Sequence, residues 1–125
     1  MRLFVFLLFV LFHWSIGFSQ KSARTALNKV YSNKDLKSFV GQYGSLNLLE
    51  YAYDHAIVKI FNNGNKPSSD FPSCKSSVNH FTDLGIKIQP YTQYFKTENP
   101  GEILAVKSIY QLQQELHQKS IENKQ

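Results

Sequence analysis

The chain has 125 residues, 14 basic and nine acidic side chains, and a single cysteine, Cys74. One cysteine excludes an intrachain disulfide, so an apolar core must hold the fold together. The basic residues are spread along the sequence as single positions, whereas a nucleic-acid footprint requires clustering on one face. We therefore expect the formal net charge of +5 to serve solubility, and we disfavour nucleic acid as a partner.

The N-terminus has the pattern of a secretory signal peptide. Arg2 is followed by an unbroken apolar run from Leu3 to Phe12, and small residues stand at Gly17 and Ser19. We predict cleavage after Ser19, which makes residues 1–19 the signal peptide. The protein would then be exported to the periplasm or the extracellular space.

An uncleaved membrane anchor is the alternative interpretation of the same segment. His13 and Trp14 interrupt the uncharged stretch, which falls short of the roughly 18 apolar residues that a membrane span requires. No second long apolar segment follows, so we expect that the mature chain, residues 20–125, does not span a membrane.

Residues 20–125 are predicted to form one small domain that begins with two short helices. Lys21–Gln42 carries apolar residues near helical spacing. Ser32, with Asp35 shortly after it, indicates a break and a new helix start. Gly41 and Gly44 are predicted to end these helices.

The next segment, residues 46–61, fits two interpretations. Leu46–His55 has apolar residues on one helical face, whereas Ile57–Phe61 is rich in the β-branched residues that favour strands. We predict a helix followed by a strand; a single helix over 46–61 is the alternative.

The C-terminal third is predicted to supply the rest of the sheet. Leu84–Gln89 alternates apolar and polar residues and predicts a strand that ends at Pro90. A hairpin is predicted for Gln93–Thr97 and Ile103–Val106, because the residues between them, Asn99-Pro100-Gly101, are of types that favour a tight turn.

A final helix is predicted to begin at Ser108, whose spacing to Gln111 fits a capping box. Glu115 is placed to pair with Lys119, and the tail from about Gln118 is predicted to fray. One apolar face of this helix is formed by Ile109, Leu112 and Leu116. The fold class is therefore α+β: a small single domain with N-terminal short helices, a three- to four-stranded mainly antiparallel sheet and a C-terminal helix.

The best candidate for a binding surface is the long loop Asn62–Ser77 together with aromatic residues that follow it. Phe71 is the only large apolar residue in a loop rich in glycine, proline, serine and asparagine. Tyr91 and Tyr94 are of a type favoured at interfaces. We predict a non-catalytic binding module that contacts an envelope or extracellular protein or glycan through Phe71, Tyr91 and Tyr94, without a cofactor or metal.

A small exported hydrolase is the alternative function. His80 with Cys74, or with nearby acids such as Asp83, could form a nucleophile and base. None of the local signatures of cysteine enzymes surrounds Cys74, and no G-x-S-x-G, P-loop or H-E-x-x-H motif occurs. His55 and His80 also lack the short spacing typical of zinc ligands.

Overall fold

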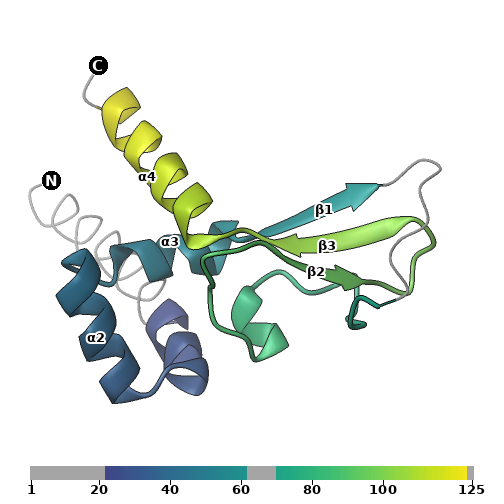
Figure 1. Cartoon of the computed structure of the whole chain (residues 1–125), viewed down its shortest axis with the longest axis horizontal. Helices are drawn as coiled ribbons and strands as arrows, with labels where there is room; N and C mark the ends of the chain where they lie inside the picture. Colours follow the sequence, from purple (N-terminus) through teal and green to yellow (C-terminus); the bar gives the residue numbers. More distant parts are fainter. Residues whose placement is uncertain (1–21, 62–69, 124–125) are drawn as a thin grey trace, which may run out of the picture.

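The computed structural model describes residues 22–61 and 70–123 (Figure 1). The predicted signal peptide, residues 1–19, and the first half of the predicted loop, 62–69, lie outside the described residues. The elements in chain order are a helix over 22–30, α2 (Asn33–Tyr43), α3 (Asn47–His55), β1 (Ile57–Phe61), the 3₁₀ helix η1 (Phe81–Leu84), β2 (Gln93–Lys96), β3 (Glu102–Val106) and α4 (Ile109–Asn123).

The α+β class is confirmed. β3 lies between β1 and β2 and pairs antiparallel with both, which gives a three-stranded sheet. Figure 1 shows the helices gathered at one end of the molecule and the sheet extending away from them. None of the helices within 22–61 and 70–123 is long and apolar enough to cross a bilayer.

The two N-terminal helices are confirmed, and the break between them has a local cause. The Ser32 hydroxyl accepts from the Asp35 N–H at 3.1 Å while the Asp35 carboxylate accepts from the Ser32 N–H, which is a full capping box. Gly44, with φ of 87°, ends α2 in the left-handed conformation that glycine adopts without strain. Gly41 lies inside α2 and ends no helix, contrary to our prediction.

Residues 46–61 form a helix and then a strand, as predicted. α3 ends at His55, and β1 begins at Ile57 with only Ala56 between them. The Ala56 carbonyl accepts from the Lys107 N–H at 2.9 Å, so the hydrogen bonds that join β1 to β3 continue to this junction. The helix therefore delivers the chain directly into the sheet.

The predicted hairpin is confirmed as β2 and β3. Phe95 pairs with Leu104, and Gly101 occupies the turn with φ of 78°. All five residues of β3 are buried, because strands flank it on both edges and side chains cover it. This is the central strand around which the sheet is built.

The strand predicted over Leu84–Gln89 is wrong. Phe81–Leu84 is a 3₁₀ helix that Gly85 ends, and residues 86–89 have no regular secondary structure and do not join the sheet. Their backbone groups have other partners: the Ile88 N–H donates to the Tyr31 hydroxyl, and the Gln89 carbonyl accepts from the Ile109 N–H, both at 2.9 Å. The alternating apolar side chains are nonetheless packed against the core.

The final helix begins as predicted. The Ser108 hydroxyl accepts from the Gln111 N–H at 3.2 Å, and α4 continues past Gln118 to Asn123. Glu115, however, pairs with Lys107 at 2.9 Å instead of the predicted Lys119, and also accepts from the Tyr51 hydroxyl. Glu115 therefore ties α4 to α3 and to the end of β3, where we expected a pair within the helix.

One apolar core joins the helices to the inner face of the sheet. Its most deeply buried large side chains come from the first helix, α3, η1, β3 and α4: Leu27, Leu49, Phe81, Leu104, Val106 and Leu112. Phe95 in β2 and Leu104 and Val106 in β3 point inward. Side chains alternate along a strand, so the residues next to them point to the opposite face of the sheet.

Candidate functional site

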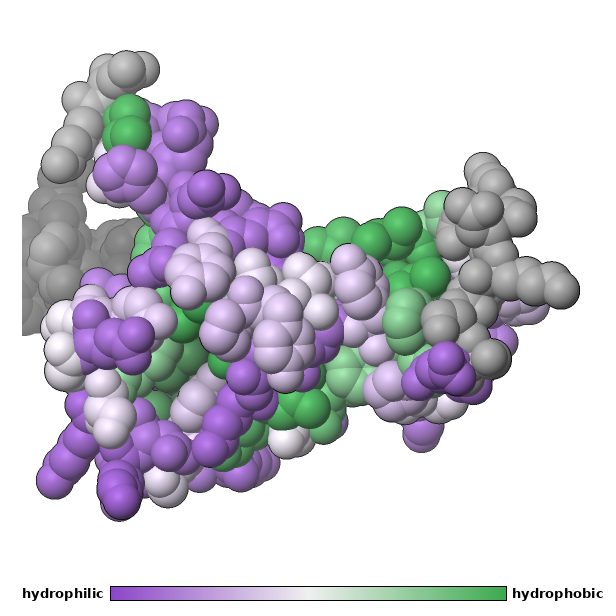
Figure 2. Space-filling model, viewed as in Figure 1, coloured by the Kyte–Doolittle hydropathy of each residue, from purple (hydrophilic) through white to green (hydrophobic). Residues whose placement is uncertain are grey.

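The outer face of the sheet is mainly apolar, with Lys96 as a charged residue at its β2 edge. Cross-strand pairing places Tyr94, Ala105 and Val58 in one row on this face, and Lys96, Ile103 and Ile60 lie in the next row. Tyr94 and Ile60 remain 42% and 43% exposed. Figure 2 shows apolar residues gathered over the region where β1 and β3 run side by side.

Phe71 packs on this face from the predicted loop. Its ring stacks on the ring of Tyr94, with centroids 5.4 Å apart and an interplanar angle of 18°. The chain segment that carries it is fixed to β2, because the Lys96 N–H donates to the Pro72 carbonyl and the Cys74 N–H donates to the Lys96 carbonyl, both at 2.9 Å. We call the surface formed by Val58, Ile60, Phe71, Tyr94, Ile103 and Ala105 the aromatic sheet surface.

Two of the three predicted contact residues therefore meet. Sequence reasoning treated Phe71 and Tyr94 as parts of different segments, and the structure stacks them on each other. Tyr91, the third, is 62% exposed just before β2 and forms no ring stack with any residue in the described part of the chain. It is accessible for contacts but does not belong to the aromatic sheet surface.

The residues of the alternative hydrolase have other roles in this geometry. The His80 ring stacks on Tyr53 with centroids 3.8 Å apart, and its Nδ1 lies 2.6 Å from the Tyr53 carbonyl oxygen. A carbonyl can only accept, so Nδ1 carries the proton and donates. Cys74 is a free thiol that lines a shallow pocket with Thr97 and Glu98, and His80 is not among the residues that line this pocket.

The surroundings of Cys74 disfavour its ionisation. Burial raises the pKa of the thiol, and the carboxylates of Glu98 and Glu102 raise this pKa further. A nucleophilic cysteine requires the opposite shift, since the thiolate is the reactive form. The thiol therefore lacks the activation that the hydrolase hypothesis needs.

We predict slow alkylation of Cys74. Because its pKa is raised, the thiolate fraction at neutral pH falls below that of an ordinary cysteine. Iodoacetamide should react with the folded protein more slowly than with a short Ser-Cys-Lys peptide, and the rate should keep rising at pH values where the peptide has reached its plateau. Mass spectrometry over time measures both rates. A folded protein that reacts faster than the peptide at neutral pH would restore the hydrolase hypothesis.

The remaining ionisable groups do not converge either. His55 stacks on Tyr51 with centroids 4.3 Å apart, while His80 stacks on Tyr53. Residues two apart on a helix point to different sides, so the two histidines lie on different flanks of α3. Within 22–61 and 70–123, no three histidine, cysteine, aspartate or glutamate residues are grouped closely enough to hold a metal ion.

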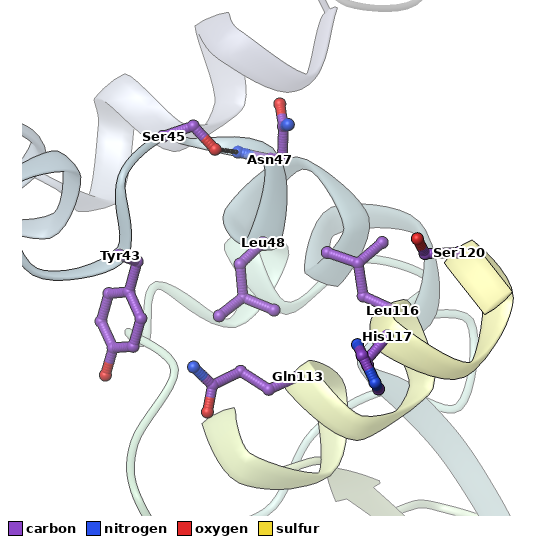
Figure 3. A pocket seen from close by; sticks show the side chains of 8 residues that line it. All are labelled: Tyr43, Ser45, Asn47, Leu48, Gln113, Leu116, His117 and Ser120. Atoms are coloured by element: carbon purple, nitrogen blue, oxygen red, sulfur yellow. Dashed lines mark hydrogen bonds between the residues drawn. The ribbon is translucent and has the colours of Figure 1, made fainter.

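A cleft that the sequence did not predict lies between the α2–α3 corner and α4 (Figure 3). Its volume is about 430 Å³. Tyr43 stands at one side and Gln113 of α4 points across towards it, with Leu48 between them. The lining residues are Tyr43, Ser45, Asn47, Leu48, Gln113, Leu116, His117 and Ser120.

Comparison of the chain with protein-family models, with curated proteins and with solved structures gives no match. The described residues present two surface features, the aromatic sheet surface and the cleft. They involve different residues and can be tested separately.

Proposed function

We propose that this chain is an exported, non-catalytic interaction module that binds a protein partner through the aromatic sheet surface. The observation that carries the proposal is the stack of Phe71 on Tyr94 over an apolar sheet face. Export is proposed from the signal-peptide pattern of residues 1–19, which places the partner in the envelope or outside the cell.

The composition of the outer sheet face supports a binding role. An antiparallel sheet with one face on the core usually presents polar side chains on the other face. Here Val58, Ile60 and Tyr94 are apolar or aromatic, and Lys96 is charged. Ile60 and Tyr94 keep more than a third of their surface exposed. Contiguous apolar surface of this kind marks interaction sites on folded proteins.

The order of the aromatic pair also supports the proposal. Phe71 and Tyr94 hold each other in place, and the backbone bonds of Lys96 fix the segment below them. Aromatic side chains that are already ordered lose little conformational freedom on binding, so more of their contact energy appears as affinity. Tyrosine and other aromatic residues are accordingly enriched among residues that dominate binding energy.

The absence of an activated nucleophile in the described residues is consistent with a non-catalytic role. The Cys74 thiol has a raised pKa, and the His80 ring donates to a backbone carbonyl. The carboxylates with the clearest partners have structural roles: Asp35 caps α2 and pairs with Lys87, and Glu115 joins α4 to α3. These contacts give Asp35 and Glu115 structural roles.

A pair of matched variants tests the proposal. The mature protein is used to capture partners from the envelope fraction of its native host, and the affinity of each purified partner is then measured by calorimetry. Tyr94→Ala and Phe71→Ala should each weaken binding by about tenfold or more, as expected for aromatic anchors. Tyr110→Ala is the control, because Tyr110 is 61% exposed but lies on α4 and is not part of the aromatic sheet surface.

Two outcomes would overturn the proposal. One is that every captured partner binds Tyr94→Ala and Phe71→Ala as tightly as it binds the unmodified protein. The other is that Tyr110→Ala weakens binding as much as Tyr94→Ala does, which would place the contact on α4. Circular dichroism of each variant ensures that lost binding is not lost folding.

A further inference from the structure

The cleft beside α4 has walls from separate parts of the chain. On one side, Tyr43 ends α2, while Ser45 and Asn47 make the turn into α3. The other side is a single face of α4, because Gln113, Leu116, His117 and Ser120 follow the i, i+3, i+4, i+7 spacing of one helical stripe.

The floor of this cleft is apolar and well supported. Leu48 is buried, and Leu116 is partly buried against the core. The Tyr43 ring is held by Phe39, with ring centroids 4.4 Å apart. A ligand entering the cleft would therefore find fixed hydrocarbon and aromatic surface beneath it (Figure 3).

The rim of the cleft carries polar side chains that are available for binding. Ser45 already accepts from the Asn47 N–H at 3.2 Å. By contrast, five lining side chains form no hydrogen bond or ion pair with any residue in the described ranges: Tyr43, Asn47, Gln113, His117 and Ser120. Together they offer hydroxyl, amide and imidazole groups that both donate and accept.

The charge of the lining selects the class of ligand. Among the residues that the structure describes, no lysine, arginine, aspartate or glutamate lines the cleft. A strongly charged ligand would find no full counter-charge there, whereas a neutral ligand with several hydroxyl groups could satisfy the amide and hydroxyl side chains. A sugar ring also has apolar C–H faces that can pack on Tyr43 and the leucines. The volume of about 430 Å³ lies within the range of small-molecule sites.

We propose that this cleft binds a neutral, polyhydroxylated ligand of the size of a mono- or disaccharide. Gln113 and His117 supply hydrogen bonds from α4, Tyr43 supplies them from the opposite wall, and Leu48 supports the apolar face of the ring. The site is independent of the aromatic sheet surface, so the module has two separate contacts. The first is for a protein partner and the second is for a small ligand.

Nuclear magnetic resonance titration of the full mature protein tests this proposal. The probes are N-acetylglucosamine, maltose and inorganic phosphate. At least one of the two sugars should shift the resonances of the Gln113 amide and the Leu48 and Leu116 methyl groups in a saturable way. Phosphate should leave them unchanged.

The adjacent glutamines provide a matched pair of variants. Gln113→Ala should weaken sugar binding by about five- to tenfold, the effect of losing one or more hydrogen bonds. Gln114→Ala should leave the affinity unchanged, because Gln114 is an exposed residue of α4 that does not line the cleft. Tyr94→Ala should also leave it unchanged, which separates this site from the proposed protein contact.

Three results would overturn the proposal. The first is the absence of a saturable shift with either sugar. The second is saturable binding of phosphate at these residues without binding of sugar, which would make this an anion site at the start of α3. The third is an equal loss of affinity in Gln113→Ala and Gln114→Ala.

Discussion

Replacing Phe81 with alanine is expected to lower the free energy of unfolding by about 3–5 kcal/mol. Phe81 is fully buried at the start of η1, and its ring meets the Tyr31 ring edge-on with centroids 6.5 Å apart. The change removes the ring from the core and leaves a cavity that the surrounding helices can fill only in part. A small domain has only about 5–15 kcal/mol of total stability, so this one change would remove much of it.

Phe61→Ala is the control for this prediction. The residue type and the change are the same, but Phe61 is 68% exposed at the end of β1, so the effect should stay within about 0.5 kcal/mol. Denaturant unfolding followed by circular dichroism measures both variants. Equal losses in the two variants would mean that Phe81 is not a core residue.

Elements whose ends are set by neighbouring residues could be predicted from the sequence. The Ser32–Asp35 and Ser108–Gln111 contacts each close within four residues, so the helix starts did not depend on the rest of the fold. Asn99-Pro100-Gly101 likewise fixed the hairpin, and Ile57–Phe61 formed a strand immediately after its helix. Local chemistry and hydrophobic period agreed at each of these places.

The wrong prediction at Leu84–Gln89 shows that alternating apolar residues do not by themselves indicate strand pairing. Alternation predicts that every second side chain is buried, and Ile86 and Ile88 do pack against the core. It does not say which backbone is available for pairing. At β2, the outer edge is already bonded at Lys96 by the Pro72–Cys74 segment. The chain at 86–89 instead bonds to Tyr31 and Ile109.

The candidate sites depended on contacts between distant residues. The stack of Phe71 on Tyr94 forms only because the segment after Phe71 joins β2, and no local signal indicates that pairing. The cleft was missed for a different reason. In the sequence, Gln113, His117 and Ser120 resemble the solvated face of an ordinary helix, and only the approach of the α2–α3 corner makes them line a cavity.

Tyr31→Phe is expected to lower the free energy of unfolding by about 1–3 kcal/mol, although the ring is kept. The Ile88 N–H donates to the Tyr31 hydroxyl at 2.9 Å and has no other partner among the described residues. Removing the hydroxyl leaves that partly buried donor without a partner, which costs more than the bond itself contributes. Tyr110→Phe, on the exposed face of α4, should change the stability by no more than about 0.5 kcal/mol.

The same hydroxyl predicts how the difference between Tyr31→Phe and the unmodified protein varies with pH. Burial raises the pKa of Tyr31 from 10.0 to about 12, against the opposing hydrogen bond from Ile88, and Asp35 adds to the rise. The folded state therefore holds the phenol proton more tightly than the unfolded state. The stabilisation is complete below pH 10 and is lost as the pH rises from 10 to about 12. Denaturant unfolding across this range should show that the difference in the free energy of unfolding between the unmodified protein and Tyr31→Phe shrinks as the pH rises. A difference that stays constant to pH 12 would mean that Tyr31 is exposed to solvent and does not bond to Ile88 in the folded protein.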